Sequence, residues 1–354
     1  METSLAPAFT NKLTKIAEIC TEAVPYITDE DRNSKTVLET ITFREPKYVR
    51  LLRDAQEVLG VSEAADELEA INKLRMKNRA SRDEITELKK KRILAPKDSI
   101  IPFLTTKTSI NKKIESLEED IAENDTQVDQ LKNKILEIFF EHQLSLGESE
   151  LDYFLISAEG DDLMTLMTIA NNMKRLQQLI EKELADDPNN VQLAKSYTGM
   201  YLISLDAYGS AHNLAISNIR NYRKKLEVIS DEAKSNYQEA IKLKAQADRS
   251  NLAHIESNIA LNKKTLDIVQ LYDGLLERRI ENLRQSQAAV AQKVRVARNT
   301  YKTLDNGSTL INLVANASSE YSLLVNFEMP ELKNIYDTGM LTAFMDISER
   351  IKAE

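Results

Sequence analysis

The sequence predicts an all-α protein, an elongated antiparallel helical bundle or coiled coil with two very long helices and short satellite helices. The first observation is that the 354 residues include only 8 glycines and 7 prolines. The second is that no proline lies in residues 103–187 or 189–329, and a proline inside a helix costs about 3 kcal/mol. The third is that apolar residues recur at alternating spacings of three and four, which is the heptad pattern of coiled coils.

The first heptad seam, meaning the line of residues that faces a partner helix, lies in residues 110–138. A polar residue inside such a seam often fixes the register and the number of partners, at a cost in stability. Asn124 is therefore a candidate register-setting residue. The seam positions are Ile110, Ile114, Leu117, Ile121, Asn124, Val128, Leu131, Ile135 and Ile138.

The second seam runs from Leu252 to Leu304, and a helix of that length would extend about 80 Å. Of its sixteen positions, thirteen are apolar or aromatic, and the other three, Asn262, Asp273 and Gln287, are further candidate register-setting residues. Because an exposed seam of this length would aggregate, each seam must be covered. The simplest arrangement packs the two seams antiparallel within one chain, and the alternative is a parallel dimer.

Turn signals divide the chain into five segments. Pro96 and Pro102 mark one break, and residues 305–308 mark another. A third break lies at Gly160, where the following Asp161 and Asp162 suit the N-cap of a helix. The segments are N-terminal helices (1–95), a first long coiled-coil helix (103–146), middle helices (160–220), a second long coiled-coil helix (221–305) and short C-terminal helices (309–354).

The segment 191–220 differs from the rest because Thr198–Asn218 contains no Lys, Arg or Glu, and Asp206 is its one acidic residue. Two interpretations stay open. The segment is either a buried helix of the bundle or a membrane-contacting head, since tyrosine favours the lipid–water interface. The candidate contacts with a membrane or partner are Tyr197, Tyr201, Leu202, Leu205, Tyr208 and Ala211.

The sequence contains no pattern typical of catalysis, cofactor binding or metal binding. The histidines 142, 212 and 254 have no partner at ligand spacing, and no phosphate-binding loop or nucleophile motif is present. Cys20 is interpreted as a structural thiol on an amphipathic helix. We therefore expect a protein that is not an enzyme and that has no catalytic residues, cofactor or metal.

Net charge and hydropathy restrict the classes of partner and the cellular locations that we expect for this protein. A net charge of −9 argues against nucleic acid, which requires a basic surface. The N-terminus does not have the pattern of a secretory signal, and no run of 18 apolar residues predicts a transmembrane helix. We expect a soluble protein that is cytoplasmic, or secreted by a non-classical route if it is a toxin.

Two functions fit these expectations. The first is a non-enzymatic coiled-coil assembly or scaffold protein, for example in a membrane-associated complex, which binds a protein partner or itself through its heptad seams. The alternative is a subunit of a multi-component α-helical pore-forming toxin, which the predicted bundle resembles in overall shape, with residues 191–220 as its membrane-contacting head. The helical content is also similar in general character to that of bacterial toxic-anion resistance proteins. No family is assigned, because no motif is specific for either group.

Overall fold

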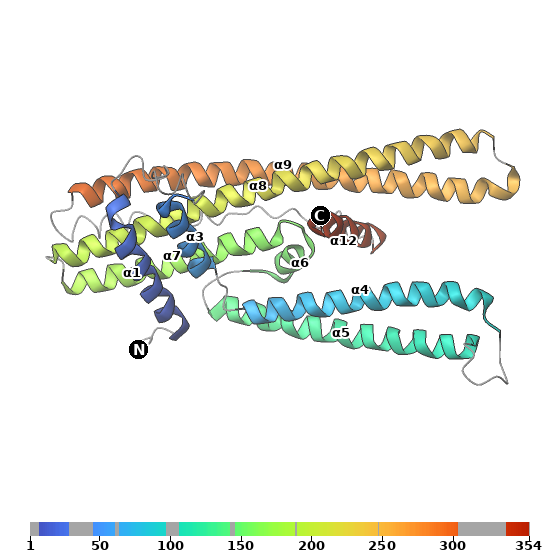
Figure 1. Ribbon diagram of the computed structural model, residues 1–354, viewed down its shortest axis with the longest axis horizontal. Coiled ribbons are helices and arrows are strands. Elements are labelled where there is room, and N and C mark those ends of the chain that lie inside the picture. The colour runs from blue at the N-terminus through green and yellow to red at the C-terminus, as the bar shows by residue number, and fades with distance from the viewer. Residues whose placement is uncertain are drawn as a thin grey trace. The chain divides into compact units, whose positions relative to one another are not determined.

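The computed structural model describes residues 7–27, 45–60, 64–96, 106–141, 146–187, 190–246, 248–303 and 338–353 (Figure 1). All regular secondary structure within these ranges is helical, which confirms the predicted fold class. Contacts between residues divide the chain into two compact units. The first unit comprises residues 1–61 and 152–354, and the second comprises residues 62–151.

The second unit is a hairpin of two helices, α4 (Ala65–Leu94) and α5 (Lys107–Glu141). Ile85 and Leu88 of α4 form a buried cluster with Ile110 and Ile114 of α5. The seam at 110–138 is therefore covered by the helix that precedes it, and the prediction that it packs along the 252–304 seam is wrong. Contact between neighbouring helices closes a shorter loop and loses less chain entropy.

The first unit is built on the two very long helices, α8 (Val191–Lys244) and α9 (Arg249–Thr303), which pack antiparallel (Figure 1). α8 continues through the segment boundary expected at residue 220. It can do so because residues 191–244 contain no proline and only two glycines, at positions 199 and 209. The chain reverses instead between Lys244 and Arg249. The seam at 252–303 thus packs on the helix before it, as in the second unit.

Shorter helices cover this hairpin. The first three, α1 (Pro7–Ile27), α3 (Lys47–Gly60) and α7 (Gly160–Asp186), contact α8. The C-terminal helix α12 (Thr338–Ala353) contacts both α8 and α9. The short helix α6 (Glu148–Ile156) leads into α7 through a tight turn.

The turn between α6 and α7 depends on Gly160. A Cβ atom at this position would lie 1.7 Å from the backbone oxygen of Phe154, so no larger residue fits without a backbone shift. Glu159 occupies the N-cap position, and its side chain makes no capping hydrogen bond. The predicted capping aspartates, Asp161 and Asp162, lie instead inside the first turn of α7. The helix N-terminus favours their negative charge there as well.

Candidate functional site

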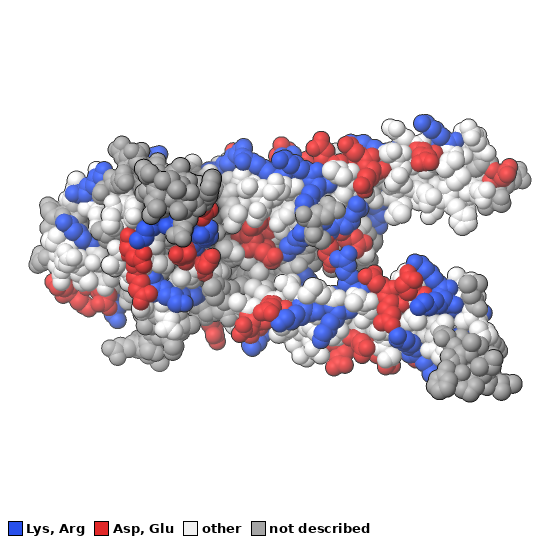
Figure 2. All heavy atoms as spheres, in the orientation of Figure 1, with Lys and Arg blue, Asp and Glu red and all other residues white. Residues whose placement is uncertain are grey.

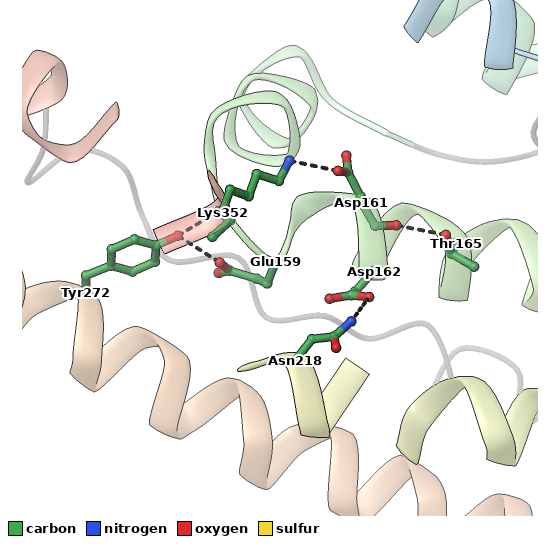
Figure 3. A network of polar contacts seen from close by, with 8 residues as sticks. Glu159, Asp161, Asp162, Thr165, Asn218, Tyr272 and Lys352 are labelled. Carbon is green, nitrogen blue, oxygen red and sulfur yellow. Dashed lines mark hydrogen bonds and ion pairs between the residues drawn. The ribbon is translucent and has the colours of Figure 1, made fainter. Parts of the chain in front are cut away.

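A buried polar cluster joins the α6–α7 turn to α9 (Figure 3). Its centre is the carboxylate of Glu159, which is 0% exposed. The Tyr153 hydroxyl donates to Glu159 Oε1, and the Tyr272 hydroxyl donates to Glu159 Oε2 at 3.0 Å. The Tyr272 oxygen also accepts the backbone N–H of Ala158 at 2.7 Å. Arg279, which is buried, lies beside Tyr153 and places a positive charge near the carboxylate.

Both phenols of this cluster act as fixed donors. Burial raises the pKa of Tyr153 and of Tyr272 well above the ordinary tyrosine value, and the negative charge of Glu159 raises both further. They therefore stay protonated near neutral pH and keep donating to the carboxylate. A buried carboxylate with two donors and a nearby guanidinium is compensated in charge and holds one defined geometry.

Beside this cluster, the first turn of α7 carries a second group of polar contacts (Figure 3). Asp162 accepts a hydrogen bond from the side-chain amide of Asn218 on α8 at 2.9 Å. Burial raises the pKa of Asp162 to about 6; the charges of Asp161 and Glu159 raise it further, whereas Asn218 lowers it. A strongly shifted carboxyl group is a recognised mark of functional sites. This turn is accordingly our candidate site.

The C-terminal helix α12 covers the site. The ring of Phe344 lies 4.4 Å from that of Tyr272, measured between centroids. Lys352 pairs with Asp161 at 2.7 Å, and Lys225 of α8 donates to the backbone oxygen of Ile351 at 2.8 Å. α12 therefore contributes an aromatic contact to Tyr272 of α9 and an ion pair to Asp161 of the acidic turn.

The sequence did not indicate this cluster. The cluster combines two distant regions of the chain and no local motif marks it: Tyr153 and Glu159 lie in one region, and Tyr272 and Arg279 lie in the other. The sequence predicts Asp161 and Asp162 as N-cap residues of a helix. The one available signal was the glycine followed by two aspartates, which predicted a helix start without predicting what contacts it.

The charge-poor segment of α8 lies in the interior of its unit. Five of its six candidate contact residues are between 0 and 3% exposed, and Tyr197 is half-buried. Asp206 is partnered there by the Tyr48 hydroxyl of α3 at 2.5 Å and by Arg298 of α9 at 3.2 Å. The five buried candidates are Tyr201, Leu202, Leu205, Tyr208 and Ala211.

His212 lies in the same buried segment. Its Nδ1 atom is 2.8 Å from the backbone oxygen of Tyr208, and the two rings meet edge to face with centroids 4.4 Å apart. Burial lowers the pKa of His212 below the ordinary histidine value. The imidazole is therefore neutral near pH 7, which suits its place in the core.

Asn124 makes a polar contact across the α4–α5 hairpin. Its amide donates to Asn78 Oδ1 at 2.7 Å, and the Asn78 amide donates to Asp125 Oδ1 at 2.7 Å. Asn78 is buried between the two helices. Towards the other end of the hairpin, Lys134 pairs with Glu67 at 2.6 Å. These paired polar groups are satisfied in only one alignment of the two helices.

The other three candidate register-setting residues lie on α9. Asp273 accepts two hydrogen bonds from Arg223 of α8, at 2.6 and 2.9 Å. Gln287 donates to Asn213 of α8 at 2.6 Å. Asn262 donates instead to a backbone oxygen four residues earlier in its own helix, at 2.8 Å. Two of the three thus link α8 to α9 within one chain.

The far end of the α8–α9 hairpin exposes aliphatic side chains. Ile241, Leu243 and Leu261 are 44, 51 and 64% exposed. No residue from Asn251 to Asn262 is buried, and Glu256 is the single charged residue in this stretch. The stretch is therefore exposed to solvent although it carries little charge. Figure 2 shows few charged side chains on the visible face of this end.

The described residues contain no group of three or more His, Cys, Asp or Glu side chains placed to hold a metal ion. Within the same ranges, no helix has the length and apolar character needed to cross a membrane. Cys20 is buried in α1, and burial raises the pKa of its thiol to about 11. His142 lies outside the described residues.

Comparison of this sequence and structure with known protein families, with curated proteins and with solved structures gave no match.

Proposed function

We propose that this protein is a non-enzymatic coiled-coil assembly protein, and that copies of it join through the hairpin tip, defined as residues 239–246 and 248–262. The observation that carries the proposal is the exposure of this tip. Residues 251–262 contain four large aliphatic side chains and one charge, and none of these residues is buried. An apolar surface of this kind on a long helix is typical of a protein–protein contact. The four aliphatic residues are Leu252, Ile255, Ile259 and Leu261.

The tip is incomplete as a coiled coil. Leu252, Ile255 and Ile259 occupy the seam of α9, yet each is only half-buried. On α8 the buried seam positions nearest the tip are Ala233 and Ala240, whose small side chains cover little apolar surface. Further helices packed around the tip would cover what α8 leaves exposed, as in a four-helix bundle.

The charge of the tip favours a second copy of the same chain as the partner. The whole chain carries −9, so copies repel each other on average. The tip has no net charge, because it contains three basic and three acidic residues. The basic residues are Lys242, Lys244 and Arg249, and the acidic residues are Glu239, Asp248 and Glu256.

A protein partner suits the tip better than a lipid bilayer. Residues 239–266 contain no Phe, Tyr or Trp, whereas aromatic residues are enriched where proteins meet the membrane interface. Leu252, Ile255 and Ile259 follow heptad spacing, which places them for helix packing.

Sedimentation equilibrium of the full-length protein over a range of concentrations tests the proposal. We expect reversible self-association. Ile241→Glu and Leu261→Glu should each weaken it by about tenfold or more, which corresponds to about 1.4 kcal/mol. Val296→Glu is a matched control, because Val296 and Ile241 are both 44% exposed and Val296 lies outside the tip.

Circular dichroism should show that all three variants keep their helical content. A protein that stays monomeric at all concentrations, or one that Val296→Glu weakens as much as the tip variants do, would overturn the proposal. A monomer that floats with phosphatidylcholine vesicles, and loses this binding in Leu261→Glu, would assign the tip to lipid instead.

A further inference from the structure

The α4–α5 hairpin gathers basic side chains at the end where α4 stops and α5 starts. Residues 89–93 and 107–113, which we call the basic end, contain seven basic residues and no acidic residue, although the whole chain carries −9. All seven basic residues are exposed. They are Lys89, Lys90, Lys91, Arg92, Lys107, Lys112 and Lys113.

Contacts between the two helices bring these segments together. The backbone N–H of Lys107 donates to the backbone oxygen of Pro96 at 2.8 Å, and the Arg92 side chain donates to Asn111 Oδ1 at 3.0 Å. Beneath them lies the buried apolar cluster that α4 and α5 share. Two basic segments that are separate in the sequence thus form one surface in the fold.

Acidic side chains neutralise part of this surface. Three of its basic residues have a carboxylate partner on the hairpin. These pairs are Lys89 with Glu118, Lys90 with Glu87 and Lys113 with Glu84. The other four form no ion pair with a carboxylate in the part of the chain that the structure describes. These four are Lys91, Arg92, Lys107 and Lys112. The basic end therefore keeps uncompensated positive charges, which repel one another and attract an anionic surface.

Helix stability explains the basic residues of α4 but not the one that begins α5. Cations suit the C-terminus of a helix and are unfavourable at its N-terminus, where the helix dipole is positive. Lys107 is the first residue of α5, and no acidic residue lies in the first turn. The helix start is fixed instead by Thr106 and Ser109, whose side chains accept from each other's backbone N–H groups at 3.0 and 3.2 Å. A charge placed against the dipole is the kind of local conflict expected at a functional surface.

We infer that the basic end binds the surface of an anionic lipid bilayer. Clusters of basic residues are attracted to anionic headgroups, and each residue near the surface strengthens binding about fivefold. Ile93 lies among these residues and is 76% exposed. Its aliphatic side chain can enter the headgroup layer, as apolar residues of basic helices do. The inference is independent of the hairpin tip of α8 and α9, since it concerns the other unit.

The acidic part of α5 favours contact through the end of the hairpin rather than through its side. Residues 115–129 contain seven acidic residues and no basic residue. Glu115, the first of them, is eight residues beyond Lys107, which is about 12 Å along the helix. The Debye length at physiological salt is about 8 Å. An anionic surface that meets the end of the hairpin is therefore attracted by the basic end and is largely screened from the acidic stretch.

A bilayer fits this arrangement better than a nucleic acid does. Nucleic acids are bound by a basic patch that extends along a helix or across a face, whereas the length of α5 beyond the basic end is acidic. The exposed Ile93 also gains more from a headgroup layer than from a phosphate backbone, which is contacted by polar and charged groups.

Vesicle flotation of the full-length protein tests the inference. Vesicles of equal phosphatidylserine and phosphatidylcholine are compared with phosphatidylcholine alone at about 0.1 M salt, where the Debye length is about 10 Å. We expect binding to the anionic vesicles alone, and its loss at about 1 M salt, where the Debye length is about 3 Å. Lys91→Gln/Lys107→Gln/Lys112→Gln should weaken binding by about tenfold or more. Ile93→Ala should weaken it by about threefold.

The matched control is Lys15→Gln/Lys195→Gln/Lys224→Gln, which makes the same change in net charge at exposed positions of the first unit. It should bind the anionic vesicles as the wild type does. Circular dichroism should show that both triple variants keep their helical content. Both should also keep the self-association of the wild type in sedimentation equilibrium, so a failure of this inference is distinguishable from a failure of the proposed function.

Three outcomes would overturn the inference. One is a wild type that does not bind the anionic vesicles at about 0.1 M salt. Another is equal weakening by the two triple variants, which would attribute binding to the net charge of the chain. The third is a wild type that binds a short DNA duplex in place of the anionic vesicles, which would assign the basic end to nucleic acid.

Discussion

The Tyr272 hydroxyl donates a hydrogen bond to Glu159 Oε2 at 3.0 Å, across 113 positions of the sequence. This contact fastens the start of α7 to the middle of α9. Tyr272→Phe would remove one donor from a buried carboxylate and would leave the N–H of Ala158 without its acceptor. We expect the free energy of unfolding to fall by about 2–3 kcal/mol, as measured by urea denaturation followed by circular dichroism.

Tyr237→Phe is the control for this change, because Tyr237 lies half-exposed on α8. It should alter the unfolding free energy by less than about 0.5 kcal/mol. Combining Tyr272→Phe with Glu159→Gln should give a loss smaller than the sum of the single losses, by about 1 kcal/mol or more. Additive effects would show that the two side chains are not coupled.

Asp162 gives a prediction about pH. Burial raises its pKa from 3.8 to about 6, so the folded state binds this proton more tightly than the unfolded chain does. The resulting stability is complete below about pH 3.8 and is lost as the pH rises to about 6. At pH 7 the charged carboxylate opposes folding. We expect Asp162→Asn to raise the free energy of unfolding at pH 7 by about 1–2 kcal/mol, less than the full shift implies, because the side chain is partly exposed.

The measurement is the difference between variant and wild type in urea denaturation at pH 4, 5, 6 and 7. This difference should be small at pH 4 and should grow towards pH 7. It isolates Asp162 from His212, whose lowered pKa changes stability in the opposite direction. Asp161→Asn, at the exposed neighbouring position, should bring no gain at pH 7 because it removes the pairing partner of Lys352. A less stable Asp162→Asn protein at pH 7 would contradict the assignment.

Local periodicity predicted the helices well. The spacing at 252–304 and the absence of proline predicted α9, and those residues needed no distant information. The same spacing indicates which face of a helix is apolar, but it does not indicate which helix covers that face. The sequence therefore identified both seams and paired them incorrectly, since each packs on the helix before it.

The buried polar cluster was beyond sequence reasoning for a related reason. Glu159 and Tyr272 come into contact only because α9 packs beside the α6–α7 turn in the folded protein. Neither residue is unusual in its own stretch of sequence. Asn124 was different, because a polar residue in an apolar seam is visible locally. Its partner, Asn78, could not be predicted from the sequence. α4 contains many polar residues, and nothing in their pattern distinguishes Asn78 as a buried one.

The Asn78–Asn124 contact makes a prediction about specificity. Asn78→Leu alone leaves the polar groups of Asn124 and Asp125 without their partner inside the hairpin. It should lower the free energy of unfolding by about 1–3 kcal/mol. Asn78→Leu combined with Asn124→Leu should recover part of this loss, because apolar contacts replace the polar pair. The double variant should also associate more, since the register is less restricted.

Urea denaturation and light scattering coupled to size exclusion measure these two effects. Asn111→Ala serves as the control, because Asn111 is exposed and accepts a surface hydrogen bond from Arg92. It should change neither the stability nor the mass of the particle measurably. If the double variant were less stable than Asn78→Leu alone, the contact would not act as a pair.

Leu205 distinguishes a core role for the charge-poor segment from a membrane role. Its side chain is 0% exposed in the first unit, so Leu205→Asp would bury a carboxylate and remove apolar contacts. We expect the free energy of unfolding to fall by about 4 kcal/mol or more, as seen in thermal and urea denaturation. Leu214→Asp, at a position that is 50% exposed on the same helix, should cost less than about 1 kcal/mol.

Flotation with phosphatidylcholine vesicles, using the same two variants, tests the alternative of a membrane-contacting head. That alternative requires Leu205→Asp to stay folded and to lose vesicle binding that the wild type has. A variant that unfolds, together with a wild type that does not bind vesicles, would assign the segment to the core. The tyrosines would then serve the bundle, because Tyr201 and Tyr208 are buried in it already and could reach lipid only if α8 separated from the helices around it.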